Sequence, residues 1–121
     1  TNGLLGKPAS IVMGGETTVT VRGKGLGGRN QELVLSAARS IGNTKNIAIA
    51  SIGTDGIDGN SNAAGAIADS TTVARAQKKK MSPLEYLVNN DSNTFFKKLN
   101  DVIKTGSTGT NVNDILVMVC L

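Results

Sequence analysis

RGKGLGGRNQE, residues 22–32, joins a segment of alternating threonine and valine to the most regular helical pattern of the chain. Its glycines stand close together, at Gly23, Gly25, Gly27 and Gly28. Because glycine adopts positive φ at little steric cost, such a loop can turn several backbone N–H groups toward one point. The helix is predicted to begin at Arg29 or Asn30, so its unpaired N–H groups face the same point as the Arg29 guanidinium. The stretch predicts a site for phosphate or carboxylate, and a solvated turn is the alternative.

The segments on either side of this loop have clear periodicities. Apolar residues recur with helical spacing at Leu33, Val34, Ala37, Ala38 and Ile41. They predict a helix that ends at Gly42. Before the loop, residues 10–22, SIVMGGETTVTVR, show two strand patterns around Gly14 and Gly15 and predict a β-hairpin.

The rest of the chain alternates strands and helices. Residues 46–52, NIAIASI, are apolar on both faces and predict a central strand of a sheet covered by helices. Further helices are predicted from Thr71, from Pro83 and over 91–102, and an apolar strand is predicted over 115–121. The predicted fold class is α/β: a mixed sheet with an N-terminal β-hairpin, flanked by helices in a layered sandwich.

Length and composition bound the class of protein. The chain of 121 residues is long enough for one domain, and because it begins at Thr1 without an initiator methionine we expect it to belong to a longer protein. Aromatic residues make up only 2% of the chain, so the core should consist of Ile, Val, Leu and Ala. The net charge of +4 favours anionic partners.

Other function classes are disfavoured by what the chain lacks. Only Tyr86, Phe95 and Phe96 could stack on bases, so nucleic acid is not an expected partner. With no histidine and a single cysteine, Cys120, this chain alone cannot build a zinc site, a Ser-His or Cys-His catalytic unit or an intrachain disulfide. No segment is apolar enough to span a membrane and no signal peptide is present, so we expect a cytoplasmic protein without membrane contact.

Two carboxylates follow the predicted central strand, in GTDGIDG at residues 53–59. Ligands of open α/β sheets gather at the carboxyl ends of strands, where loop side chains project from a rigid base. Asp55 and Asp58 could share a divalent cation, or one could remove a proton while the other binds the metal. The alternative is a pair of turn residues whose side chains bond their own backbone.

The last loop, TGSTGTNVND at residues 105–114, is again rich in glycine and hydroxyl groups. Its Asn111, Asn113 and Asp114 could donate or accept hydrogen bonds at a ligand, or they could cap the turn. For this loop to meet the Asp55 loop, the strand that follows it must begin where the strand over 46–52 ends. We therefore predict that these two strands run antiparallel.

Gly23, Gly25 and Gly28 also satisfy the dinucleotide-binding spacing G-x-G-x-x-G. The preceding segment alternates with threonine, whereas the first strand of a dinucleotide-binding fold is buried on both faces. The match is therefore interpreted as coincidental.

Long blocks of the chain nevertheless form a recognisable pattern. They are GGETTVTVRGKGLGGRNQEL (14–33), GTDGIDG (53–59), AAGA (63–66), NNDSNTFF (89–96) and TGSTGTNVND (105–114). In order and in content they closely resemble the C-terminal MOFRL domain of class II glycerate 2-kinases, a family in which some members are labelled hydroxypyruvate reductases. The resemblance covers nearly the whole chain, and its first and last blocks are long enough to be specific.

The resemblance implies an activity and a partner domain. Such an enzyme transfers the γ-phosphate of ATP to the 2-hydroxyl of D-glycerate, with a divalent metal such as Mg²⁺, and forms 2-phosphoglycerate. Residues 1–121 would be its C-terminal domain, with the site in a cleft against a larger N-terminal domain, and the isolated chain would be inactive. By matching motifs, Arg29 would bind the substrate carboxylate or the transferring phosphate, and Asp55 would hold the metal or orient the attacking hydroxyl.

The complete predicted site combines the resemblance with the chemistry of the loops. Its catalytic residues are Arg29 and Asp55, and its metal ligands are Asp55 and Asp58. Its substrate-binding residues are Gly25, Gly27, Gly28, Asn30, Asn111, Asn113 and Asp114. Dimerisation is left open.

The chain departs from the family pattern in one place that bears on the metal. The family often reads G-I-D-G-P-T-D before AAGA, whereas Asn60, Ser61 and Asn62 stand here, which removes one carboxylate. Two other functions stay open at this point: a reductase acting on hydroxypyruvate, which would need a nicotinamide cofactor, and a stand-alone anion-binding or regulatory module.

Overall fold

The computed structural model describes residues 6–121. Its elements, in chain order, are β1 (Ala9–Gly15), α1 (Arg29–Ile41), β2 (Ile47–Gly53), β3 (Gly65–Asp69), α2 (Thr72–Lys78), α3 (Pro83–Val88), α4 (Ser92–Leu99), β4 (Val102–Ile103) and β5 (Asp114–Cys120). No helix in this part of the chain is both long enough and apolar enough to cross a membrane.

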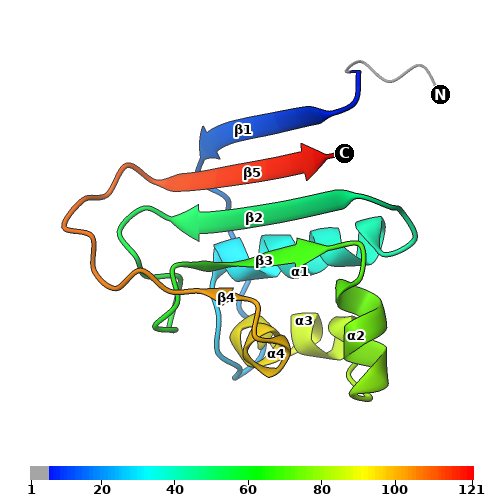
Figure 1. The fold of residues 1–121 in the computed structure, drawn as a ribbon. Helices are drawn as coiled ribbons and strands as arrows, with labels where there is room; N and C mark the ends of the chain where they lie inside the picture. The colour runs from blue at the N-terminus through cyan, green and yellow to red at the C-terminus, as the bar shows by residue number, and fades with distance from the viewer. Residues whose placement is uncertain (1–5) are drawn as a thin grey trace.

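The strands form one sheet in the order β1-β5-β2-β3-β4, and every neighbouring pair is antiparallel (Figure 1). The predicted α/β class and the central position of β2 are confirmed. The predicted mixed sheet is corrected to an antiparallel one. The reason is that β2 and β3 are joined by the loop over residues 54–64, without the crossover helix that parallel neighbours need.

The predicted N-terminal hairpin is wrong. β1 pairs along its length with β5, from Ala9 opposite Cys120 to Gly15 opposite Asp114. Gly14 and Gly15 therefore end a strand instead of forming a turn. Residues 16–22 form no strand, and in Figure 1 this segment leaves β1 and passes the other strands toward α4.

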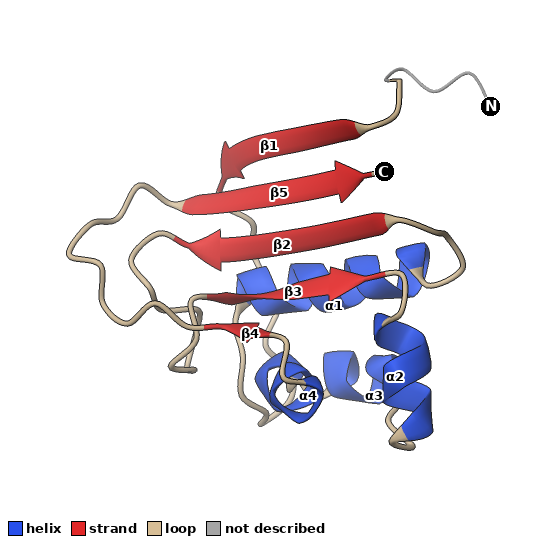
Figure 2. Ribbon diagram, viewed as in Figure 1, coloured by secondary structure: helices blue, strands red, loops and turns tan. Residues whose placement is uncertain are grey.

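Helix α1 covers one face of the sheet and supplies much of the core (Figure 2). Its Val34, Leu35 and Ala38 are fully buried, as the predicted stripe requires. They pack against alternate residues of β2 and β3, including Ala66 and Ala68. The small side chains of β3 let the helix backbone lie close to the sheet.

The opposite face of the sheet is not covered by helices in the described part of the chain, which corrects the prediction that β2 is covered on both faces. Val12 is 69% exposed, Ile67 43% and Val119 36%, and the strand register places them on this face. An antiparallel sheet can leave one face in solvent.

The sequence interpretation missed β3 and β4. The run AAGAIAD has small residues with weak strand preference, and only pairing with β2 makes it a strand. A Cβ atom at Gly65 would lie 1.8 Å from the Ser51 carbonyl oxygen, so the pairing itself requires glycine there.

The prediction on which the site depends is confirmed: β2 and β5 run antiparallel, with Gly53 opposite Asp114. The end of β2 and the start of β5 therefore lie side by side. The loops that carry Asp55 and Asn111 meet at this edge of the sheet.

Candidate functional site

Arg29 is the first residue of α1 and forms a two-pronged ion pair with the first residue of β5. Its Nε and Nη2 donate to the two carboxylate oxygens of Asp114 at 2.6 and 2.8 Å. The hydrogen bond to Asp114 raises the pKa of Arg29, so the guanidinium stays charged. The Arg29 side chain is 32% exposed, whereas that of Asp114 is 8% exposed. Asp114 therefore holds one edge of the Arg29 guanidinium, and the other edge of the guanidinium faces outward.

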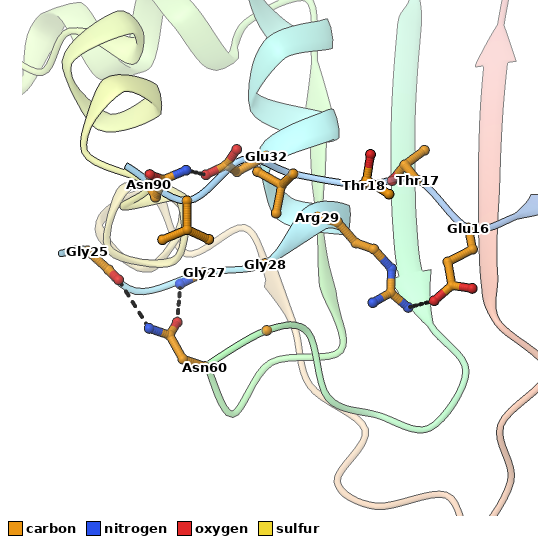
Figure 3. A pocket seen from close by; sticks show the side chains of 13 residues that line it. Glu16, Thr17, Thr18, Gly25, Gly27, Gly28, Arg29, Glu32, Asn60 and Asn90 are labelled. Atoms are coloured by element: carbon orange, nitrogen blue, oxygen red, sulfur yellow. Dashed lines mark hydrogen bonds and ion pairs between the residues drawn. The ribbon is translucent and has the colours of Figure 1, made fainter. Parts of the chain in front are cut away.

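A pocket of about 410 Å³ opens beside Arg29 (Figure 3). It is lined by Glu16, Thr17, Thr18, Val19, Val21, Gly25, Gly27, Gly28, Arg29, Glu32, Gly59, Asn60 and Asn90. Glu16 lies across from the guanidinium, with its Oε1 3.7 Å from Nη2 of Arg29. The Nη1 atom and the backbone N–H groups of Gly28 and Arg29 donate to no residue that the structure describes. Because Gly28 and Arg29 line the pocket, these donors are candidates for binding an anion there.

The glycine loop does not form the predicted nest of N–H groups. Of its four glycines only Gly27 has a positive φ, +151°. The loop N–H groups donate instead to neighbouring segments: that of Gly25 to the Asn89 carbonyl at 2.9 Å, and that of Gly27 to Oδ1 of Asn60 at 2.9 Å. The glycines are therefore required mainly by close packing.

Gly25 has no room for a side chain. A Cβ atom there would lie 2.3 Å from the Cβ of Asp91, so Gly25→Ala must displace the loop or α4. We expect the variant to lose about 1–3 kcal/mol of unfolding free energy, measured by urea denaturation. Gly15→Ala is the matched control, because nothing lies within 4 Å of a Cβ at Gly15. Equal stability of the two variants would contradict the packing role.

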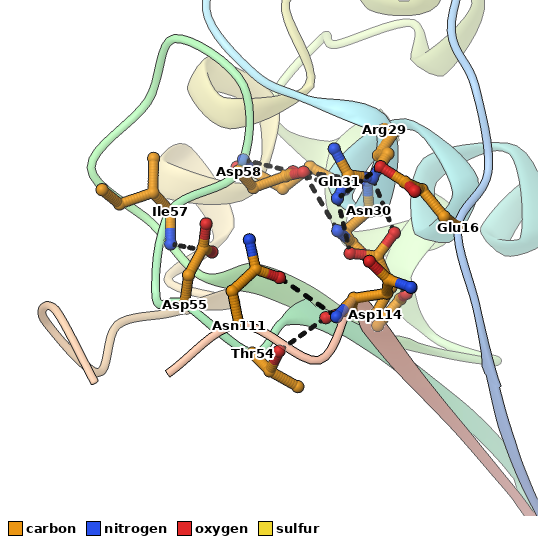
Figure 4. Close-up of polar contacts among 12 residues, drawn as sticks. Glu16, Arg29, Asn30, Gln31, Thr54, Asp55, Ile57, Asp58, Asn111 and Asp114 are labelled. Atoms are coloured by element: carbon orange, nitrogen blue, oxygen red, sulfur yellow. Dashed lines mark hydrogen bonds and ion pairs between the residues drawn. The ribbon is translucent and has the colours of Figure 1, made fainter. Parts of the chain in front are cut away.

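The anion at the start of α1 is a side chain of the protein itself, Asp58 (Figure 4). Its Oδ1 accepts from the backbone N–H and Nδ2 of Asn30 at 3.0 and 3.2 Å. Its Oδ2 accepts from the backbone N–H and Nε2 of Gln31, both at 2.9 Å. Asp58 is 1% exposed, and these four donors use its roughly four lone-pair positions. The predicted metal role of Asp58 is accordingly revised to stabilisation of the helix N-terminus.

Asn30 belongs to the same buried network and not to the pocket. It is 1% exposed, and its Oδ1 accepts a hydrogen bond of 2.6 Å from the Ser51 hydroxyl on β2. Because its amide already bonds Asp58 and Ser51, the predicted substrate contact of Asn30 is revised to a link between α1 and the sheet.

The loops over 54–62 and 105–113 are hydrogen-bonded to each other where β2 ends and β5 begins. The N–H and hydroxyl of Thr54 both donate to the Asn113 carbonyl, at 3.0 and 2.7 Å. Asp55 is half-buried, and its Oδ1 accepts from the N–H of Ile57 at 3.1 Å. Asn111 is exposed, and its Oδ1 accepts from the Asn113 N–H.

The structure thus brings part of the predicted site together. Arg29 and Asp114 are in direct contact, and Gly25, Gly27 and Gly28 line the same pocket. Asp55, Asn111 and Asn113 lie on the adjoining loops but do not line it. Among the described residues, no group of three or more His, Cys, Asp or Glu side chains is placed to hold a metal ion.

Comparison with known protein families decides the family. The model of the MOFRL family matches residues 9–114. The chain belongs to the MOFRL family.

Curated relatives of this MOFRL domain are mostly glycerate kinases. The D-glycerate 2-kinase of Thermotoga maritima is 48% identical over 113 residues, which is 93% of this chain and 27% of the relative. The glycerate 2-kinase of Picrophilus torridus is 49% identical over 111 residues, 92% of this chain and 25% of the relative. A provisionally named hydroxypyruvate reductase of Agrobacterium vitis is 44% identical over 110 residues, 89% of this chain and 29% of the relative.

A solved structure has the same fold. The crystal structure of glycerate kinase from Thermotoga maritima superposes with a TM-score of 0.95 at 46% identity, over 98% of this chain and 28% of that one. This MOFRL domain therefore spans about a quarter of the length of its relatives.

The pocket of the MOFRL domain has two acidic residues outside the predicted site, Glu16 and Glu32. From the sequence, Glu16 could be a ligand, but a solvated charge at the start of a strand is the favoured interpretation. Glu32 accepts a 2.6 Å hydrogen bond from Nδ2 of Asn90, and burial raises the pKa of its carboxyl. The spacing of Glu32 could have indicated this position, because a residue three positions after Arg29 lies on the same face of the helix. Glu16 had no comparable signal, since only the path of residues 16–22 brings it to Arg29.

The G-x-G-x-x-G match in the MOFRL domain lacks the structural context of a dinucleotide site. β1 is an edge strand that pairs antiparallel with β5, and residues 16–28 separate it from α1. A dinucleotide fingerprint needs a parallel strand followed at once by the glycine turn and the helix.

Proposed function

We propose that this chain is the C-terminal, substrate-site domain of a glycerate 2-kinase, which phosphorylates D-glycerate with ATP to give 2-phosphoglycerate. The supporting observation is Arg29, held by Asp114 at the N-terminus of α1 and facing a pocket with unpaired N–H donors. The glycerate kinase names of the longer relatives support the substrate. An N-terminal region of the same polypeptide would complete the site.

The chemistry of the reaction fits this arrangement. Glycerate carries a carboxylate, and phosphoryl transfer develops negative charge that depends mainly on positioning and electrostatic stabilisation. A guanidinium binds carboxylate or phosphate through two parallel N–H bonds, and fixing its orientation beforehand reduces the entropy lost on binding. In this proposal Asp114 is a positioning residue for Arg29 instead of a substrate ligand.

Asp55 is the residue of this domain that best fits a magnesium ion. Mg²⁺ at nucleotide sites is bound by one or two carboxylates together with phosphates and water, so a cluster of three protein ligands is not needed. Asp55 is half-buried at the end of β2, and its Oδ2 accepts no hydrogen bond from a described residue. When bound, the ion would neutralise phosphate charge.

Replacing Asp55 by asparagine in the full-length enzyme tests this assignment. We expect kcat/KM for glycerate to fall about 10–100-fold and the Mg²⁺ concentration for half-maximal rate to rise, because the anionic ligand is lost. The control is Glu85→Gln, an exposed carboxylate at the start of α3. An unchanged Mg²⁺ requirement in Asp55→Asn would show that Asp55 does not bind the metal.

The activity itself is tested by a coupled ADP-release assay with D-glycerate, ATP and Mg²⁺. We expect glycerate-dependent ADP release from the full-length polypeptide and none from residues 1–121 alone. A folded full-length protein without this activity would contradict the proposal.

The reductase name of one relative makes hydroxypyruvate reduction the second candidate. It is tested on the same preparation by following NADH or NADPH oxidation with hydroxypyruvate. Oxidation of the cofactor without ADP release would favour the reductase.

A further inference from the structure

Residues 16–22, ETTVTVR, have the alternating pattern of a β-strand but lie in no strand. Their backbone makes two hydrogen bonds to described residues, both with one side chain. The Arg22 N–H donates to Oδ1 of Asn90 at 2.7 Å, and Nδ2 of Asn90 donates to the Thr20 carbonyl at 3.2 Å. The other backbone groups of this segment have no described partner.

The Asn90 amide imitates the backbone of a neighbouring strand. In a parallel ladder, one residue donates to the carbonyl before its partner and accepts from the N–H after it. Asn90 does this on the two sides of Val21, and its Oδ1 also accepts from the N–H of Gly23 at 2.8 Å, so the strand-like pattern ends at Arg22. The Thr20 carbonyl and the Arg22 N–H point toward Asn90. Because backbone groups alternate along an extended chain, we expect those of Val19 and Val21 to point the opposite way.

The side of this segment that points away from Asn90 has backbone groups that are unpaired in the described part of the chain. Val21 is 71% exposed, and the N–H and carbonyl groups of Thr17, Val19 and Val21 bond to no described residue. Unpaired edges of extended chain pair readily with an added strand, and the β-branched side chains of Thr and Val favour the extended conformation. The same segment forms one wall of the pocket at Arg29.

We propose that residues 16–22 pair with a β-strand supplied by the upstream polypeptide of the full-length kinase, along the edge formed by Thr17, Val19 and Val21. The proposal rests on the proposed function in taking this chain as part of a longer enzyme. About three quarters of each relative lies outside the matched region, so a covalently linked segment is available to fill the edge. The added strand would close the pocket over Arg29 and bring further residues to it.

The decisive measurement is amide hydrogen exchange at single-residue resolution, on residues 1–121 and on the full-length protein. We expect the Val19 and Val21 amides to exchange about 100-fold more slowly in the full-length protein, because strand pairing ties their exchange to opening of the interface. Thr18 and Thr20 point to the other side and should change little. Equal exchange of Val19 and Val21 in both proteins, or uniform protection of all four amides, would overturn strand addition.

A matched pair of proline variants tests the same edge, because proline removes one N–H. In the full-length protein we expect Val21→Pro to release the protection of Val19, and kcat/KM for glycerate to fall roughly tenfold, the equivalent of one lost hydrogen bond. Thr20→Pro should keep both the protection of Val19 and the normal kcat/KM. The Thr20 N–H has no described partner, and the carbonyl of residue 20 can still accept from Asn90. Neither variant should lower the melting temperature of residues 1–121 alone. Equal effects of the two prolines would overturn the proposal.

Two further outcomes separate the alternatives. Protection of Val19 in residues 1–121 alone that rises with concentration would identify a second copy as the occupant and overturn the proposal. Glycerate kinase activity without protection would leave the proposed function standing and reject the strand. Protection of Val19 and Val21 without kinase activity would support the added strand and reject the proposed function.

Discussion

Replacing Arg29 with alanine in the full-length enzyme is expected to lower kcat/KM for D-glycerate about 10³-fold, because arginines that stabilise a transferring phosphoryl group contribute at least that much. Arg29 is the cation that lines the pocket, and Asp114 fixes its orientation through two hydrogen bonds. Initial-rate kinetics at saturating ATP and Mg²⁺ measure the effect. A loss in kcat would place Arg29 at the transferring phosphate, whereas a rise in KM alone would place it at the glycerate carboxylate.

The same substitution leaves Asp114 buried without its partner. We therefore expect Arg29→Ala to lose about 1–3 kcal/mol of unfolding free energy as well. The double variant Arg29→Ala/Asp114→Asn removes the stranded charge and should regain stability without regaining activity. A single variant of normal stability and near-normal kcat/KM would contradict both roles of Arg29. Recovery of activity in the double variant would show that the loss came from misfolding.

Replacing Asp58 with alanine is expected to destabilise residues 1–121 by about 3–5 kcal/mol, because a buried, fully bonded carboxylate is removed and its donors are stranded. Asp58 accepts from four N–H groups of Asn30 and Gln31 and is 1% exposed. Urea denaturation measures the change. The expected loss is a large fraction of the stability of a small domain, so partial unfolding at 37 °C is a further expected result.

The comparison of Asp58→Asn with Asp55→Asn separates the two carboxylates. Asp58→Asn should lower stability, because it places an amide donor against the donors of α1. Asp55→Asn should change the Mg²⁺ requirement while leaving stability within about 0.5 kcal/mol, as expected for a partly exposed loop residue. If Asp58→Asn left stability intact and abolished the Mg²⁺ dependence, Asp58 would be the metal ligand after all.

The parts of the fold that the sequence predicts well have long, strong periodicities. The apolar stripe from Leu33 to Ile41 predicts α1 with its observed start at Arg29. The apolar runs over residues 46–52 and 115–121 predict β2 and β5 to within about two residues. In each case the local pattern and the final packing agree, so no distant partner is needed to decide the element.

Strand pairing was predicted less well because it depends on residues far apart in the chain. The TTVTV pattern predicts the second strand of a hairpin, but these residues lie in no strand, and the partner of β1 is β5, more than 90 residues later. β3 has little local signal and becomes a strand only by pairing with β2. Conversely, residues 16–22 have the alternating pattern of a strand but no pairing partner in the described part of the polypeptide.

The sequence by itself determined the family, the helix at Arg29 and the two central strands, because each depends on residues that are neighbours in the chain. Only the tertiary structure decided that Asp58 accepts hydrogen bonds from the start of α1, that Asp114 orients Arg29, and that the glycines serve close packing. Those contacts join residues 27 to 85 positions apart. A carboxylate's role depends on which donors the fold brings to it, and spacing along the chain does not contain that information.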